Sequence, residues 1–246
     1  MDRGLYVAMT GAKQIMQAQA VNNHNIANLS TIGFRADAVS FASQPIYGPG
    51  YATRVNAVAG DAGTDFSTGV MESTGRDLDI AVNGKGFIAV QGTDGQEAYT
   101  RAGDLRVTST GAVTTASGLA VLTQSGPLII PPSTVVSIGS DGTVSAVPQG
   151  SAAFAITQVD RIKLVNPPTQ DLQKGDDGLL RLKSGGKAKA DDTVSVTSGM
   201  LESSNVNAAQ SLISMIELQR LYEFQIKSIN STDTNEQSAE RMMLTS

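Results

Sequence analysis

Residues 200–246 have the sequence MLESSNVNAAQSLISMIELQRLYEFQIKSINSTDTNEQSAERMMLTS, which contains neither Gly nor Pro. Residues 12–32 also lack both, whereas all eight prolines and most of the 25 glycines lie between these two stretches. Because Gly and Pro are the residues least compatible with a helix interior, both ends of the chain are predicted to be helical. The region between them has the short apolar runs and frequent turn residues typical of strands. We therefore predict an α+β protein in which two terminal helices flank a β-rich region.

Both predicted helices carry mainly apolar residues at alternating spacings of four and three, which is the heptad pattern of coiled-coil helices. In the last helix these are Ala208, Leu212, Met215, Gln219, Tyr222, Ile226 and Ile229. In the first helix they are Leu5, Met9, Ala12, Met16, Gln19, Asn23 and Ile26. The helices are therefore predicted to form a coiled-coil-like domain, with each other or with neighbouring copies. On periodicity alone, an ordinary intramolecular helix pair explains the pattern equally well.

Further features of the ends favour contacts with more than one partner. A second apolar stripe, which flanks the first on the last helix, consists of Val206, Ala209, Ile213 and Ile216. Asn207 precedes this helix with Gln210 three residues later, which is a capping signal. Gly4 and Gly11 weaken the first helix by about 1 kcal/mol each. We expect helices that are marginal alone and become ordered on assembly.

The middle of the chain divides into two parts. Residues 36–75 have little helical period or strict alternation, and breakers interrupt them at Pro45, Gly48, Pro49 and Gly50. We interpret this segment as an extended linking arm. Residues 76–202 have closely spaced turn signals between short apolar runs, which predicts an antiparallel sandwich or open barrel. The expected organisation is a terminal helical domain of residues 1–35 plus 203–246, the arm, and a β-rich outer domain of residues 76–202.

Composition argues against several classes of function. The chain has no Cys, which excludes disulfides, thiolate metal sites and cysteine nucleophiles. The net charge is −5 without a basic stripe, so nucleic acid is not an expected partner. Aromatic residues make up 4% with no Trp, which argues against a large aromatic-lined ligand site. The N-terminus lacks the pattern of a cleavable signal peptide, and no stretch approaches the roughly 20 apolar residues of a membrane span, so membrane insertion is not expected.

Candidate catalytic and metal-binding residues are few. His24, the one histidine, lies among asparagines and is expected to make hydrogen bonds on a helix surface. Asp77 and Asp79 are two residues apart, which suits paired carboxylates, but a solvated strand face is the preferred interpretation. Gly84-Lys85-Gly86 is too short for a phosphate loop. Asp176-Asp177-Gly178 and Asp191-Asp192 are typical of turns, although they could hold calcium. We predict no catalytic, cofactor-binding or metal site.

Three blocks of sequence resemble the bacterial flagellar rod and hook family. The first, VNNHNIANLSTIGFR at residues 21–35, is similar to the signature N-N-L-A-N-x-x-T-x-G-F-[KR]. The second is TGRDLDIAVNGKGF at residues 74–87, followed by YTRAG at 99–103. The third is GMLESSNVN at residues 199–207, followed by QRLYE at 219–223. The blocks occur in family order, and only about 115–195 lacks a strong match.

The resemblance implies a structural, non-enzymatic subunit. Family members are secreted by the flagellar type III apparatus and stack into a hollow axial structure, with paired terminal helices inside and the β-rich domain outside. The opening residues are most similar to proximal-rod members, which implies a location in the rod of the basal body, across the periplasmic space. The alternative is the distal rod, whose members typically have Trp near the position of Tyr6. Implied partners are other rod subunits below and above, and the export apparatus during secretion. The surrounding rings are a further candidate.

The helix patterns and the matched blocks together define an expected assembly interface. Its residues are Leu5, Met9, Met16, Asn25, Asn28, Thr31, Gly33, Phe34, Asn205, Asn207, Leu212, Met215, Gln219, Arg220, Tyr222 and Ile226. We expect the asparagines of residues 25–28 to satisfy backbone groups at a helix end. Gly33 is expected in a left-handed or crowded conformation, with Phe34 packed against a neighbour or the arm. Arg220 and Tyr222 are residue types that anchor interfaces.

Two other classes of protein remain as alternatives. An extracellular β-rich adhesin or phage-tail-like subunit with coiled ends would share the architecture but not the ordered blocks. An enzyme would need a pocket around His24 or around Asp77 and Asp79.

Overall fold

The computed structural model describes residues 3–45, 55–149 and 156–244, which form two compact units. The helical unit consists of Met1–Asn28, Asp37–Asp65 and Val206–Ser246. The β-rich unit consists of Leu29–Ala36 and Phe66–Asn205. The α+β class is confirmed, with the two terminal helices in contact and the strands in small antiparallel sheets.

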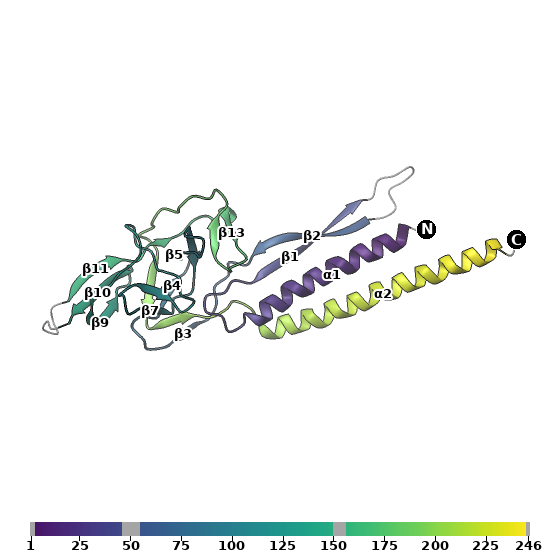
Figure 1. Cartoon of the computed structure of the whole chain (residues 1–246). Helices are drawn as coiled ribbons and strands as arrows, with labels where there is room; N and C mark the ends of the chain where they lie inside the picture. Colours follow the sequence, from purple (N-terminus) through teal and green to yellow (C-terminus); the bar gives the residue numbers. More distant parts are fainter. Residues whose placement is uncertain (1–2, 46–54, 150–155, 245–246) are drawn as a thin grey trace. The chain divides into compact units, whose positions relative to one another are not determined.

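The helical unit contains α1 (Arg3–Ala27), α2 (Ala208–Leu244) and a hairpin of β1 (Asp37–Pro45) and β2 (Val55–Thr64). The helices run antiparallel, because Asn22 near the end of α1 donates to the carbonyl of Ser211 near the start of α2. Gly11, earlier in α1, lies beside Gln225, farther along α2. Figure 1 shows α2 continuing past the start of α1, and the hairpin running along α1.

The β-rich unit holds the remaining described strands, all paired antiparallel as predicted. Its largest sheet has the order β12 (Leu164–Val165), β5 (Phe87–Gln91), β6 (Glu97–Thr100), β14 (Leu180–Leu182) and β13 (Leu172–Lys174). A three-stranded sheet has the order β11 (Thr157–Arg161), β10 (Thr143–Pro148) and β9 (Ser133–Ile138). The paired strands are β15 (Ser195–Ser198) with β4 (Ile80–Asn83), β16 (Met200–Glu202) with β3 (Met71–Ser73), and β7 (Leu105–Val107) with β8 (Val113–Thr115). A 3-10 turn, η1 (Thr169–Asp171), precedes β13.

Apolar side chains from several of these sheets meet in one main core. Its fully buried members come mainly from the inward positions of the short strands and include Ile80, Val82, Ile88, Val90, Leu105 and Val121. The predicted turn after β4 is present, and Gly84 takes the positive φ of +66° that its position requires. Burial across the sheets, rather than long strand pairing, therefore holds this unit together.

The units differ from the expected organisation at the segment 36–75. We predicted an extended arm, whereas β1 and β2 form a hairpin that belongs to the helical unit. Most described residues of β1 are exposed on both strand faces, so the sequence shows no apolar alternation to reveal the strand. Residues 66–75 belong to the β-rich unit, where β3 pairs with β16. The predicted breakers Gly48, Pro49 and Gly50 lie outside the described residues.

Residues 29–36 also fall in a different unit from the one expected. We assigned residues 29–35 to the helical domain and residue 36 to the arm, whereas all of them pack in the β-rich unit. The reason is that Phe34 and Arg35 are both buried there.

Candidate functional site

The end of α1 is fixed by two asparagines of the first matched block. Asn25 Nδ2 donates to the carbonyl of Asp37 at 2.8 Å, and its Oδ1 accepts from the Asp37 amide at 2.9 Å. Asn28 Nδ2 donates to the carbonyl of His24 at 2.9 Å, in the last turn of the helix. Both asparagines thus bond to backbone groups at the helix end, as their residue type predicts. Asn25 in addition joins the helix to the first residue of β1 within the helical unit.

Gly33 lies where the chain leaves this helix end, and both predicted features are present. Its φ is +68°, which favours Gly, and a Cβ there would lie 2.3 Å from the backbone carbon of Arg101. Its amide donates to the carbonyl of Glu202 at 2.8 Å. Thr31, two residues earlier, is exposed, and its carbonyl accepts from the amide of Phe34. Only a residue without a side chain can bring this segment so close to the backbone of Arg101 and Ala102.

Phe34 is buried within the chain's own β-rich unit. The Nζ of Lys174 lies 4.0 Å from the centroid of the Phe34 ring and donates to the carbonyl of Arg35 at 2.7 Å. We expected this ring to pack against a neighbour or the arm, and its observed cover instead includes a cation–π contact inside the chain.

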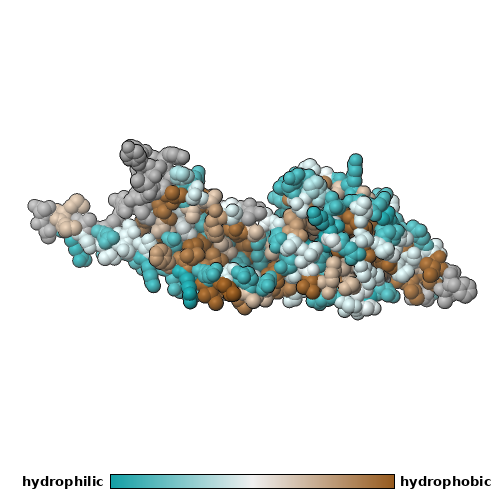
Figure 2. All heavy atoms as spheres, turned by 180° about the vertical axis from the view of Figure 1, so that it is seen from behind, coloured by the Kyte–Doolittle hydropathy of each residue, from teal (hydrophilic) through white to brown (hydrophobic). Residues whose placement is uncertain are grey.

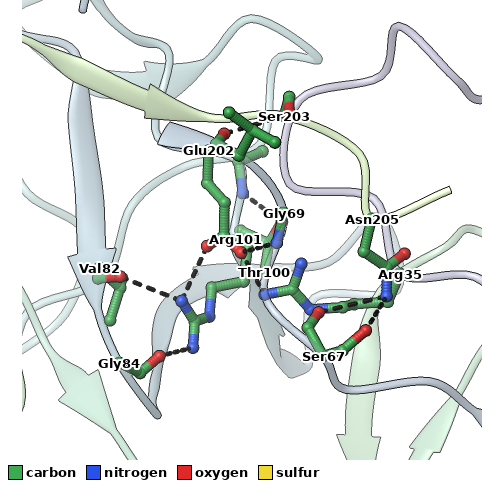
Figure 3. A network of polar contacts seen from close by, with 12 residues as sticks. Arg35, Ser67, Gly69, Val82, Gly84, Thr100, Arg101, Glu202, Ser203 and Asn205 are labelled. Carbon is green, nitrogen blue, oxygen red and sulfur yellow. Dashed lines mark hydrogen bonds and ion pairs between the residues drawn. The ribbon is translucent and has the colours of Figure 1, made fainter. Parts of the chain in front are cut away.

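Arg35, Arg101 and Glu202 form a buried ion-pair network in the β-rich unit (Figure 3). Glu202 is 0% exposed and accepts from Arg35 Nη2 at 2.6 Å, from Arg101 Nη1 at 2.8 Å and from the Gly69 amide at 2.8 Å. Arg101 also donates to the carbonyls of Val82 and Gly84. Since Arg35 follows α1 and Glu202 precedes α2, one carboxylate joins the two segments that lead to the helices.

Two more asparagines of the third block lie between Glu202 and α2. Asn205 Oδ1 accepts from the amide of Ala36 at 2.8 Å, and its Nδ2 donates to Ser67. Asn207 Oδ1 accepts from the amide of Gln210 at 3.1 Å, so the predicted N-cap of α2 is confirmed. Asn205 thus holds the same two segments together beside the ion-pair network (Figure 3).

The α1–α2 contact includes several small residues. The buried positions of α1 are Ala8, Ala12, Ile15, Ala18 and Asn25. On α2 the least exposed positions follow the spacing of one helix face and are Ser211, Ser214, Met215, Leu218, Tyr222, Gln225, Ser228 and Ile229. The predicted residues at spacings of four and three form one row on each helix, which we call its seam. At 3.6 residues per turn, the centre of each seam lies about 80° around the helix axis from the centre of the buried residues of the same helix. The predicted seams are therefore not the centre of the intramolecular contact.

Several large apolar members of the two seams remain exposed. Met9 and Met16 on α1 are 52% and 55% exposed, and Leu212 on α2 is 53% exposed. Because the helices are antiparallel, equal rotations in the same sense bring the two seams to the same face of the pair. We call this the seam face and define it by Met9, Met16, Leu212, Gln219 and Ile226. The half-buried Leu5, Met215 and Tyr222 lie along its edge.

The hairpin lies on the opposite side of the helix pair. There a groove of about 290 Å³ is lined by Ala18 and Val21 of α1, Phe41 of β1, and Leu218 and Leu221 of α2, among others. The seam face is therefore left uncovered by the described part of the hairpin. Figure 2 shows apolar side chains gathered on the surface of the helical unit. Ile213 and Ile216 of the second apolar stripe on α2 are exposed as well, as are Phe224 and Arg220 on the same side of the helix.

The residues considered for catalysis have structural partners. His24 Nδ1 lies 3.0 Å from Asp37 Oδ2 on an exposed surface. Asp77 is exposed, but our interpretation of Asp79 as solvated was wrong, because Asp79 is 2% exposed and lies 3.4 Å from Arg76. The apolar residues around it alternate as in a strand, but Asp79 precedes β4 and its side chain is buried.

The aspartates considered for calcium also bind within the protein. Both Asp177 oxygens accept from Arg181, which lowers the pKa of Asp177, and Asp191 accepts from Thr193. Among the described residues, no group of three or more His, Cys, Asp or Glu side chains is placed to hold a metal ion. Within the same residues, no helix is long and apolar enough to cross a membrane.

Glu202 and its two arginines form a buried network that sequence reasoning did not single out. All three lie in the matched blocks, but a charged residue in a short strand usually faces solvent. The pairs are 167 and 101 residues apart in sequence, so spacing gave no signal.

Comparisons with known proteins identify relatives along the whole chain. Two family models match: the flagellar hook protein FlgE/F/G D1 domain at residues 81–146, and the flagellar basal body rod FlgEFG protein C-terminal region at residues 197–242. The first extends into the region 115–195 that showed no strong resemblance by motif. The chain is 39% identical to the flagellar basal-body rod protein FlgF of Escherichia coli (strain K12), over 99% of both chains. It is 37% identical to FlgF of Salmonella typhimurium (strain LT2), over 99% of both. It is also 33% identical to the rod protein FlgG of Bacillus subtilis (strain 168), over 95% of this chain and 96% of that protein.

Proposed function

Because this chain belongs to the flagellar basal-body rod protein family, we propose that it assembles into the proximal rod through its seam face. It is a structural subunit of the basal-body rod and not an enzyme. The proximal position rests on its similarity to FlgF over its full length. The proposal concerns which residues make the rod contacts and which subunits they meet.

The observation that carries the proposal is the exposed apolar row on one face of the helix pair. Burying a large apolar side chain is worth about 1.5–3 kcal/mol, so Met9, Met16 and Leu212 represent a substantial unused gain. Small residues bring α1 and α2 together, which leaves the larger side chains for other chains. We infer that helices of neighbouring subunits cover this face, with Gln219 as a polar position that favours one register.

The far end of α2 offers a second contact. Since Gly11 lies beside Gln225, the start of α1 lies opposite about residue 233 of the antiparallel partner. The last turns of α2 therefore extend beyond α1, and Met242 and Met243 at their end are 68% and 74% exposed. A helix segment this short is marginal in water by itself. We infer that an adjacent rod subunit stabilises it.

We propose rod proteins on both sides of this subunit as its partners, with other proximal subunits below and the distal rod protein above. During secretion the chain would pass through the flagellar export apparatus, and afterwards its β-rich unit would face outward in the periplasmic space. No nucleic-acid partner is proposed, in keeping with the net charge of −5.

The seam face is tested by charge substitutions in a strain of the source bacterium that lacks its own copy. Met16→Glu and Leu212→Glu place a carboxylate where we expect a buried apolar contact, and we expect loss of swimming and of complete rods. Gln17→Glu is the matched control, because Gln17 is exposed and points about 100° away from Met16. The purified variants should keep the helical circular-dichroism signal of the parent chain. Normal rods from both apolar-to-Glu variants would show that another face makes the contacts.

Cross-complementation separates the proximal assignment from the distal alternative. We expect this chain to restore swimming in Escherichia coli cells that lack FlgF, and not in cells that lack FlgG. Restoration only in the cells without FlgG would assign the chain to the distal rod.

A further inference from the structure

The ion-pair network around Glu202 leaves several buried donors unused. The Nε and Nη1 of Arg35 and the Nε of Arg101 have no hydrogen-bond partner among the described residues, and both side chains are 3% exposed. A buried donor without an acceptor typically costs about 1–3 kcal/mol, so native proteins rarely leave one unmet. Three such groups on two neighbouring arginines indicate that an acceptor belongs beside them.

A small cavity lies at these arginines. Its volume is about 10 Å³, which is room for one water-sized particle. Its described lining contains the basic side chains Arg35, Arg101 and Lys174, and contains no carboxylate. Gly33 and Gly178 form part of the wall, where the lack of a side chain leaves the space open.

The charges around the cavity do not balance. Glu202 is the carboxylate of the network, and both of its oxygens already accept hydrogen bonds, Oε1 from Arg35 and Oε2 from Arg101. Two buried guanidinium groups therefore share the one negative charge of Glu202. Burial lowers the pKa of Arg101, and the nearby charge of Arg35 lowers it further, while Glu202 opposes both effects.

We propose that this cavity binds a single small monovalent anion of the halide class, held by the N–H groups of Arg35 and Arg101 and the charge of Lys174. A water molecule would accept the same hydrogen bonds but would leave the excess positive charge uncompensated. A phosphate or a carboxylic acid is too large for the space. The anion stabilises the segment between Gly33 and Arg35, and so the connection from α1 into the β-rich unit.

The first test is the thermal unfolding of the full-length purified chain in sodium chloride or bromide against sodium gluconate at matched ionic strength. A specific site raises Tm by about 3–6 °C at a halide concentration tenfold above Kd, and Tm then continues to rise with the logarithm of the concentration. General screening by salt gives the same curve for halide and gluconate. Coincident curves at all concentrations would overturn the proposal and assign the cavity to water.

Two variants locate the effect. Lys174→Met keeps the aliphatic stem but removes the charge at the cavity wall, and we expect it to lose at least half of the halide-dependent shift in Tm. Lys187→Met, at an exposed lysine outside the cavity lining, should keep the full shift. An equal shift in both variants would place any halide effect elsewhere on the protein.

Crystals of the unchanged chain grown with bromide provide a direct reading. The expected result is an anomalous peak within hydrogen-bond distance of Arg35 and Arg101. Density for water without an anomalous signal at saturating bromide would contradict the assignment, whether or not the chain assembles into rods.

Discussion

Replacement of Glu202 by Gln removes the negative charge of a fully buried network and leaves its shape nearly unchanged. Glu202 accepts three hydrogen bonds, two of them from the guanidinium groups of Arg35 and Arg101. The Gln side chain also has an NH2 group in place of one carboxylate oxygen, so a donor would face the guanidinium N–H donors of Arg35 or Arg101. Breaking a buried ion pair by removing one partner costs about 3–5 kcal/mol. Since whole domains are stable by only about 5–15 kcal/mol, this one change should remove a large fraction of the stability.

The expected readout is a fall of Tm by roughly 6–20 °C, at about 2–4 °C per kcal/mol for a unit of this size. Thermal unfolding followed by the circular-dichroism signal of the β-strands measures it. Glu72→Gln is the matched control, because Glu72 is exposed on β3, the strand paired with the strand of Glu202. A surface change of this kind should stay within about 0.5 kcal/mol. A loss below about 1 kcal/mol for Glu202→Gln would refute the view that the ion pairs hold the two segments together.

A double substitution distinguishes lost attraction from an uncompensated charge. Glu202→Gln leaves two arginines without a counter-charge, whereas Glu202→Gln combined with Arg101→Met removes one of them. The double variant should therefore be less destabilised than the sum of the single variants, by about 0.5–3 kcal/mol. Additive losses would mean that the two side chains act independently.

Three further substitutions test individual local interactions at Gly33, Asn25 and Asp104. Gly33→Ala should lower stability much more than Gly75→Ala. Both glycines have positive φ, but a Cβ at Gly33 would lie 2.3 Å from backbone, whereas a Cβ at Gly75 would meet nothing within 4 Å. Thermal unfolding measures the difference, and equal losses would contradict the crowding argument. Asn25→Asp removes the Nδ2 donor that bonds to the carbonyl of Asp37, so it should cost about 1–3 kcal/mol of stability and speed the exchange of nearby amide hydrogens. Asn23→Asp, at an exposed site, should do neither. Equal exchange in the two variants would count against a role of the Asn25–Asp37 bonds. Burial raises the pKa of Asp104, so the charged carboxylate destabilises the fold at neutral pH. Asp104→Asn should therefore raise Tm at pH 7, and this gain should shrink as pH falls through the raised pKa and be absent below the unfolded value of about 4; a lower Tm at pH 7 would refute this.

The division into helices and strands was predictable because Gly and Pro are distributed so unevenly along the chain. The β1–β2 hairpin was not, since most described residues of β1 are exposed and only a short part of it faces the helices. The roles of Asn28, Gly33 and Asn207 followed from residue type, because capping and positive φ are local requirements. The role of Glu202 depends on partners more than 100 residues away, and no local pattern carries that information.

The two seams show why periodicity pointed to one helix face while the intramolecular contact uses another. A search for heptads gives weight to large apolar residues, such as Met9, Met16 and Leu212, which remain exposed in the single chain. The contact between α1 and α2 instead includes several Ala and Ser residues, which let the helices approach closely but add little to an apolar pattern. If an intramolecular pair were the final state, the larger side chains would gain most by facing inward. Their placement on one open face, opposite the hairpin groove, is what a subunit requires when neighbouring chains complete its packing.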